Sequence, residues 1–331
     1  MYNEDDLASA IKAGVLTNDT ATAFRAHVAQ QKGLPKNIHE EDFRFITGFN
    51  DIFVFIACVL LLASIAWIGA AATPPVGALG VAAAAWGLAE FFTRKRRMAL
   101  PSIVLLLAFV GGVFMTFAFM PGNKDGSLAS ASAIAAAAAW LHWLRFKVPI
   151  TVAAGAIAFI GVVITLLFPT ANEAAKSADI LSVLAGVGVF ILALRWDTAD
   201  TLRQTRKADV AFWLHLLAAP LLVHPVLASL NIFGGPTSPA QAIMVVGLYI
   251  VIALVSLTID RRALMVSALA YVLYTFSALL KQYGVVSLHF AITAMAIGSA
   301  LLLLSAFWHP SRALILNCLP LFVRKNVPPF H

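Results

Sequence analysis

Ten apolar segments, each close to the length that crosses a bilayer, constrain the fold of this chain more than any other feature. They lie at residues 52–72, 76–92, 98–120, 128–144, 148–168, 180–194, 210–230, 242–259, 263–280 and 287–308. A membrane-spanning helix needs about 20 mostly apolar residues, with a range of about 17–25. The bilayer core offers the backbone no hydrogen-bond partner, so such segments cross it as helices. The sequence therefore predicts an all-α, polytopic transmembrane helix bundle of about ten spans.

Composition and turn chemistry agree with this division. Hydrophobic residues make up 61% of the chain and charged residues only 12%, whereas about a quarter of a soluble domain is charged. Thr73-Pro74-Pro75 predicts a tight turn, and residues 121–126 and 234–236 predict polar loops. The sixth segment is short, and snorkelling of Arg195 and Trp196 would extend it. The alanine-rich second and fourth segments are expected inside the bundle, with the third and fifth facing lipid.

The positions of the basic residues predict the orientation. With a cytosolic N-terminus and ten spans, 20 of the 23 Lys and Arg residues lie on the cytosolic side, and only Lys124, Lys176 and Lys281 lie outside. Cytosolic loops carry such an excess, so both termini are predicted to be cytosolic. The net charge of +7 then reflects topology and gives no reason to expect a nucleic-acid partner. Anionic inner-leaflet lipid headgroups are the expected partners of Arg94, Lys95, Arg96, Arg97, Arg324 and Lys325.

The two ends of the chain differ from its middle. Residues 1–48 are polar and predict a helical hairpin with an interfacial lead-in, which serves either as a cap or as a docking site for a protein partner. Gly14 is expected to end the first helix, and Thr17 or Asn18 to cap the second. Residues 49–309 form the predicted transmembrane domain. Residues 310–331 are too short to span and predict an interfacial tail.

The seventh segment is the strongest candidate for a functional site. It carries His215, His224, Pro220 and Pro225, and polar groups and helix breakers are costly at membrane depth. The two prolines free the carbonyls of the residues four positions earlier, Leu216 and Leu221. The histidines are nine residues apart, which places them on opposite helix faces. Each imidazole fits either a proton or ligand site or a hydrogen bond to a neighbouring helix.

Other ionisable residues give weaker candidates. Glu90 lies near the cytosolic end of the second segment, where it suits either a salt bridge or proton coupling. His224 and His289 lie in the outer parts of their segments, so they form a candidate outer-side pair. Asp260 flanks a span and is expected to pair with Arg261 or Arg262.

Motifs of known chemistry are missing from the sequence. There is no Walker loop, dinucleotide fingerprint, His-Glu-x-x-His or nucleophile elbow. The two cysteines have no metal-ligand spacing. We therefore predict no metal and no cofactor, and we favour a protein that is not an enzyme.

The turns on the predicted cytosolic side suggest a repeat. Their basic residues Arg97, Lys147, Lys207 and Arg262 recur at similar intervals. A two-helix unit repeated in parallel would produce this spacing, and so would any ten short spans with cytosolic charges. The two halves show no inverted repeat of the kind found in many transporters.

Three stretches carry a resemblance to known sequences: Ala-Gly-Val-Leu-Thr at 13–17, residues 45–53, and Arg-Lys-Ala-Asp-Val-Ala-Phe-Trp-Leu-His-Leu-Leu-Ala-Ala-Pro at 206–220. Together they resemble bacterial multi-pass membrane proteins of unknown function that begin with a short cytosolic helical hairpin. The resemblance implies a location in the bacterial cytoplasmic (inner) membrane and no particular activity.

Two functions follow as hypotheses. The first is a transporter-like or channel-like bundle for a small solute or a proton. The second is a non-catalytic scaffold or sensor that uses residues 1–48 to dock a partner. An enzyme that acts on lipid-linked substrates is a third and weaker hypothesis.

Overall fold

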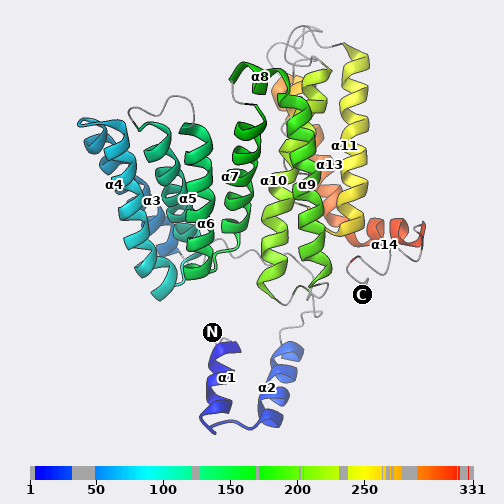
Figure 1. Cartoon of the computed structure of the whole chain (residues 1–331). Coiled ribbons are helices and arrows are strands. Elements are labelled where there is room, and N and C mark those ends of the chain that lie inside the picture. The colour runs from blue at the N-terminus through cyan, green and yellow to red at the C-terminus, as the bar shows by residue number, and fades with distance from the viewer. Residues whose placement is uncertain are drawn as a thin grey trace. The chain divides into compact units, whose positions relative to one another are not determined.

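The computed structural model describes residues 4–31, 49–120, 127–168, 171–200, 203, 205–230, 238–262, 264–265, 269, 272–277, 289–318, 320 and 327. Every regular element in these ranges is a helix (Figure 1). The chain divides into two compact units, Met1–Phe43 and Arg44–His331.

The N-terminal unit is a pair of helices, α1 (Glu4–Lys12) and α2 (Asn18–Gln31). Gly14 has a φ of 71°, a left-handed conformation that suits glycine and ends α1. Thr17 caps α2, because its Oγ1 accepts a hydrogen bond from the Thr20 amide at 3.2 Å. Leu7 and Ala21 are buried, so each helix contributes an apolar residue to the interior of this unit.

The second unit contains α3 (Phe49–Ala70), α4 (Pro74–Ala89), the π-helix η1 (Glu90–Lys95), α5 (Ala99–Ala118), α6 (Ser127–Phe146), α7 (Ile150–Leu167), α8 (Ala171–Lys176), α9 (Ala178–Thr198), α10 (Arg206–Ser229), α11 (Pro239–Ile259), α13 (His289–Ala306) and α14 (Trp308–Cys318). Nine of the ten predicted segments coincide with these helices. The ninth, 263–280, lies partly outside the described residues.

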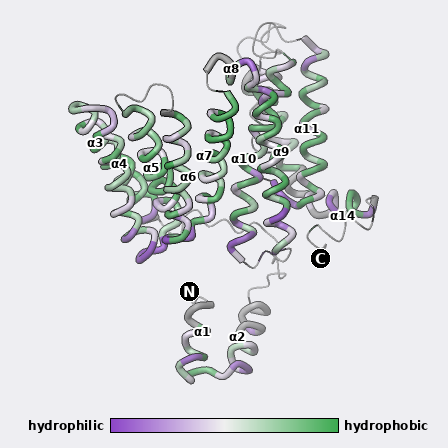
Figure 2. Tube along the Cα trace, in the orientation of Figure 1, coloured by the Kyte–Doolittle hydropathy of each residue, from purple (hydrophilic) through white to green (hydrophobic). Residues whose placement is uncertain are grey.

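Seven of the described helices are long and apolar enough to cross a membrane: Asn50–Ala70, Pro74–Lys95, Ala99–Ala118, Ile150–Leu167, Ala178–Thr198, Arg206–Ser229 and Pro239–Ile259. Apolar residues run along these helices, and hydrophilic residues gather toward helix ends (Figure 2). An all-α membrane protein follows from this pattern. The count of ten spans and the cytosolic termini stay predictions.

Successive helices form antiparallel hairpins, α4 with α5, α6 with α7, and α9 with α10 (Figure 1). Close approach explains several small residues, as membrane helix packing requires. A Cβ atom on Gly112 of α5 would lie 2.8 Å from the Ala78 carbonyl oxygen of α4. A Cβ atom on Gly186 of α9 would lie 2.8 Å from Cγ of Leu222 on α10.

Four turns share one unusual backbone state. Arg97, Lys147, Arg203 and Asp260 have φ values of 53°, 55°, 53° and 56°. They follow η1, α6, α9 and α11 in turn. Left-handed backbone is costly for residues other than glycine, so its recurrence favours a common hairpin unit. This observation supports the repeat more strongly than the spacing of basic residues does.

The expectation that the third segment faces lipid is wrong. In the most apolar 18-residue stretch of each helix, 39% of the residues are buried in α5, against 28% in Pro74–Lys95. The reason is position, since α5 packs against α3, α4 and α6. The fifth segment, α7, is only 17% buried.

Candidate functional site

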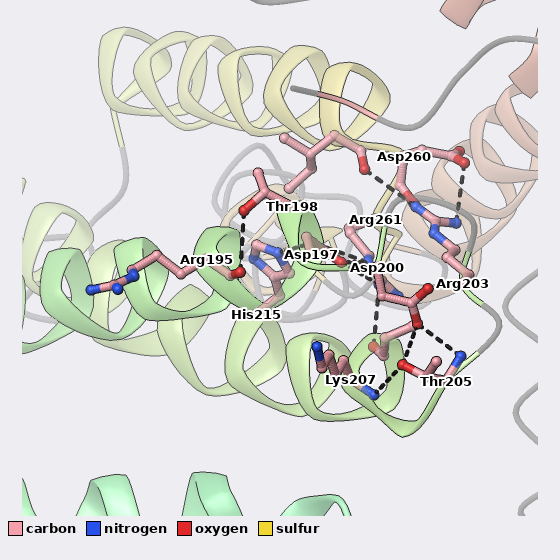
Figure 3. A network of polar contacts seen from close by, with 12 residues as sticks. Arg195, Asp197, Thr198, Asp200, Arg203, Thr205, Lys207, His215, Asp260 and Arg261 are labelled. Carbon is pink, nitrogen blue, oxygen red and sulfur yellow. Dashed lines mark hydrogen bonds and ion pairs between the residues drawn. The ribbon is translucent and has the colours of Figure 1, made fainter. Parts of the chain in front are cut away.

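Asp197 lies at the centre of a buried polar cluster that joins α9, α10 and the chain after α11 (Figure 3). Its carboxylate is in the last turn of α9, and its side chain is only 9% exposed. The Oδ2 atom lies 2.7 Å from Nε2 of His215. The Oδ1 atom accepts hydrogen bonds from Nε of Arg261 at 3.1 Å and from Nη2 of the same guanidinium. One carboxylate thus pairs with both an imidazole and a guanidinium.

The α9–α10 turn sets the register of this pair. The Asp200 carboxylate accepts hydrogen bonds from the amide and the hydroxyl of Thr205, at 2.8 and 2.6 Å. The Thr205 Oγ1 atom in turn accepts from the Lys207 amide at 3.2 Å and caps α10. Because the turn is fixed in this way, Asp197 near the end of α9 faces His215 inside α10.

His215 is fully buried, and one of its ring nitrogens has no partner among the described residues. The carboxylate faces Nε2, so we place the neutral ring's proton on that atom. The Nδ1 atom has no hydrogen-bond partner within the part of the chain that the structure describes. The ring of Phe190 packs edge-on at 5.4 Å. Nδ1 is therefore a buried hydrogen-bond acceptor that can take up a proton, which would convert the neutral ring to an imidazolium.

Arg261 enters the cluster because the chain reverses at Asp260. The amide of Arg261 donates to the Ser256 carbonyl at 2.9 Å, and Asp260 is in the left-handed conformation. The Arg261 guanidinium is then 1% exposed. It donates from Nη2 to the Ala208 carbonyl of α10 at 3.2 Å as well as to Asp197. One side chain from the end of α11 thereby binds both α9 and α10.

Asp260 forms a second buried centre beside the first. Its Oδ2 atom lies 3.1 Å from Nη1 of Arg203. Its Oδ1 atom accepts a hydrogen bond from Nε1 of Trp308 at 2.7 Å and lies 3.8 Å from Nε of Arg312. The Arg262 guanidinium lies 4.8 Å from the centroid of the Trp308 ring. Burial lowers the pKa of the Arg312 guanidinium, and the charge of Asp260 opposes that shift.

The expected pairing of Asp260 with Arg261 or Arg262 is wrong for both arginines. Asp260 pairs with Arg203 and Arg312, while Arg261 pairs with Asp197. The left-handed turn at Asp260 is the physical reason, because it directs two consecutive side chains toward different neighbours.

Glu90 lies at the helix end rather than in the core. Its carboxylate accepts from Nε and Nη2 of Arg145 at 2.7 and 3.0 Å, and from Arg94 at 3.3 Å. The Glu90 side chain is 32% exposed. Glu90 therefore forms a partly exposed salt bridge between η1 and α6, and its environment differs from the buried environment of Asp197.

The other predicted residues of α10 are placed separately. His224 is exposed and Pro225 is buried, whereas Pro220 is half-buried. The helix continues through both prolines. The candidate pair of His224 and His289 lies outside what the structure describes, because the side chain of His289 is not among the described positions.

A proline-freed carbonyl on α10 has found a partner. Pro225 cannot donate to the Leu221 carbonyl, and Oγ of Ser182 on α9 donates to it at 2.9 Å. Pro225 thus shapes the α9–α10 contact through the carbonyl that it leaves free.

Sequence reasoning missed a second buried imidazole, His142 on α6. Its Nδ1 atom lies 3.3 Å from Oγ1 of Thr151, and Nε2 has no partner among the described residues. Three aromatic rings surround it, those of Trp86, Phe109 and Phe146. The signal was present, since the sequence places this histidine among the last residues of an alanine-rich span next to two tryptophans.

The arrangement can hold and release a proton but has no other evident chemistry. Across the described residues, no group of three His, Cys, Asp or Glu side chains could hold a metal ion. Comparison with known proteins adds no assignment, because no family model, no curated protein and no solved structure matches this chain.

Proposed function

We propose that this protein is a proton-translocating transporter of the bacterial inner membrane, with both termini cytosolic, and that His215 is the group that gains and loses the proton. The observation that carries this proposal is the environment of the ring. His215 is fully buried, its Nε2 atom lies 2.7 Å from Asp197, and its Nδ1 atom has no partner among the described residues.

The charge balance of the cluster gives the proton its effect. With neutral His215, Asp197 and Arg261 compensate each other. A proton on Nδ1 adds a buried positive charge, which is costly in a dry environment. The protein can lower that cost by loosening the Asp197–Arg261 contact, so that the carboxylate, already 2.7 Å from Nε2, neutralises the imidazolium more fully. Arg261 also holds Ala208 of α10, so protonation is coupled to the contact between α10 and α11.

The test uses the purified full chain in proteoliposomes loaded with a pH-sensitive dye. An imposed pH gradient is measured in buffer alone and with a low-molecular-weight filtrate of a bacterial lysate outside. We expect the wild-type protein to dissipate the gradient faster than protein-free liposomes in at least one of these conditions. His215→Gln should abolish that excess, because an amide can hydrogen-bond to Asp197 but does not gain or lose a proton near neutral pH.

The control is His224→Gln, on the same helix but exposed, and it should behave as wild type. Equal rates for the wild-type protein and His215→Gln in both conditions would overturn the proposal.

A second candidate function is docking of a protein partner by the N-terminal unit. The favouring observation is that Met1–Phe43 forms its own compact unit, with Val15 76% exposed. Deletion of residues 2–34 should remove a partner from a pull-down with the full chain. Identical partner sets with and without these residues would rule docking out.

A further inference from the structure

The π-helix η1 lies at the end of an exposed apolar stripe and beside an open hollow. A full turn of π-helix is rare and occurs frequently at functional sites. The hollow, which we call the η1 hollow, has a volume of about 500 Å³ and is lined by Gly87, Glu90, Phe91, Arg94 and Lys95. This site is separate from the Asp197 cluster, and the inference does not rest on the proposed function.

The charge around the η1 hollow is strongly positive. Residues 94–97 are four consecutive basic residues, and all four are exposed. The one carboxylate in the hollow, Glu90, already pairs with Arg145 and Arg94. Lys95 pairs with no residue in the described part of the chain. The hollow therefore offers an uncompensated ammonium group beside a guanidinium.

The exposed face of α4 leads directly into this charge. Val76, Leu79, Ala83 and Gly87, which we call the α4 stripe, are all exposed and recur at intervals of three and four residues. The same spacing continues to Phe91 and Lys95. Val76 and Leu79 are 53% and 57% exposed. An apolar track thus ends in a cationic hollow along one helix face.

The arrangement of an apolar stripe that ends in a cationic hollow matches one class of molecule. A free phosphate ester would use the cations but leave the α4 stripe exposed. A neutral lipid would use the stripe but leave the Lys95 ammonium without a counter-charge. We propose that the η1 hollow binds the phosphate headgroup of an anionic glycerophospholipid, with an acyl chain along the α4 stripe. Each basic residue near an anionic headgroup contributes about 1 kcal/mol.

Gly87 makes the hollow testable apart from its charge. A Cβ atom on Gly87 would meet no other atom within 4 Å, so a larger side chain is tolerated there and fills the hollow. Gly87→Leu removes space and keeps every cation, whereas Lys95→Gln removes one cation and keeps the space. Lys207→Gln is the matched control, because Lys207 is an exposed basic residue at the start of α10.

The experiment is native mass spectrometry of the full chain in a neutral detergent, titrated with dioleoyl phosphatidylglycerol or dioleoyl phosphatidylcholine. We expect the phosphatidylglycerol to bind at least about fivefold more tightly, and Lys95→Gln to weaken it by roughly fivefold. Gly87→Leu should weaken it by at least as much, and Lys207→Gln should leave it unchanged. Glycerol 3-phosphate should not displace the lipid, because it lacks the acyl chains.

Three results would overturn the proposal. Equal affinity for the two lipids excludes headgroup charge. Wild-type affinity in Gly87→Leu would show that the lipid does not bind in the hollow and that a diffuse basic surface binds it instead. Displacement by glycerol 3-phosphate excludes the stripe and identifies a soluble phosphate ester as the ligand.

Discussion

Buried charges are the residues on which this structure depends most directly. Asp197, Asp260, Arg203, Arg261 and Arg312 all have side chains that are less than 10% exposed. A buried ion pair contributes little relative to well-packed apolar side chains, but loss of one partner leaves an uncompensated charge and costs about 3–5 kcal/mol. The cluster is therefore better understood as specifying which helix ends meet than as a source of net stability.

Asp197→Leu should lower the free energy of unfolding by about 3–5 kcal/mol, because it leaves Arg261 buried without its carboxylate. Arg261→Met should have a similar cost. The double variant Asp197→Leu/Arg261→Met should cost much less than the sum, because no charge stays unpaired. Denaturant unfolding of the protein in detergent measures all three values. Additive losses would show that the two side chains act independently.

Glycine substitutions at two of the left-handed turn residues, Lys147 and Arg203, should change the free energy of unfolding in different directions. In Lys147→Gly, the glycine relieves about 1–2 kcal/mol of backbone strain. The same change removes the cation–π contact of Lys147, whose Nζ atom lies 5.4 Å from the centroid of the Trp143 ring. That contact contributes about 0.5–1 kcal/mol. The expected result is between no change and a small gain in unfolding free energy.

Arg203→Gly has the same strain to relieve but loses the ion pair with Asp260. We expect a net loss of about 1–4 kcal/mol, which is the cost of the lost ion-pair partner less the relieved strain. The same unfolding assay applies, and a clear loss of unfolding free energy in Lys147→Gly would show that backbone strain at this turn is unimportant.

At the scale of helices, α9 and α10 form the hairpin that holds the candidate site. Three features form their contact: the close approach of the two helices at Gly186, the hydrogen bond from Ser182 to the Leu221 carbonyl, and the Asp197–His215 pair. Helix periodicity could predict that α10 has two faces. It could not predict that Ser182 meets Leu221, because the register between two helices depends on the turn and on packing along their full length.

The Ser182–Leu221 contact makes a double-variant prediction. Ser182→Ala leaves the Leu221 carbonyl without its donor, which costs about 1–3 kcal/mol. Pro225→Ala supplies a backbone N–H to the same carbonyl. In the Pro225→Ala background, Ser182→Ala should therefore cost much less. Thermal unfolding of the four proteins gives the coupling energy, and a coupling near zero would show that the Ser182 bond does not compensate for the proline.

The length of α9 also explains why Asp197 was missed. The apolar segment at 180–194 is too short to include it, but the helix runs on to Thr198. Arg195 and Trp196 lie in this extension, as snorkelling predicts. The last polar turn of a helix is poorly marked by hydropathy, because its residues resemble those of a loop. Asp260 was therefore predicted as an isolated flanking charge, and Asp197 was not singled out.

At the scale of the whole molecule, local patterns predicted the helices well and the contacts poorly. Helix starts carry clear local signals, such as the first-turn Pro74 of α4 and the capping box of Ser238 and Gln241 at α11. The buried position of α5, the choice of Arg203 as the partner of Asp260, and the burial of His142 all depend on which helices are neighbours. Neighbour choice is set by the packing of many side chains at once, so no single motif encodes it.

Topology is the property of the whole chain that the sequence predicts most sharply. Lys124 precedes α6 in the sequence and Lys147 follows it, and the excess of basic residues predicts Lys147 in the cytosol and Lys124 outside. In a background of Cys58→Ala and Cys318→Ala, Lys124→Cys should react with a membrane-impermeant maleimide in intact bacterial cells. Lys147→Cys should react only after the membrane is permeabilised. Lys12→Cys and Lys325→Cys should both behave like Lys147→Cys, because an even number of spans returns the chain to its starting side. Labelling of only one terminus in intact cells would contradict ten spans. Labelling of Lys147→Cys in intact cells would contradict the predicted orientation, and with it the expectation that the basic residues 94–97 face the inner leaflet.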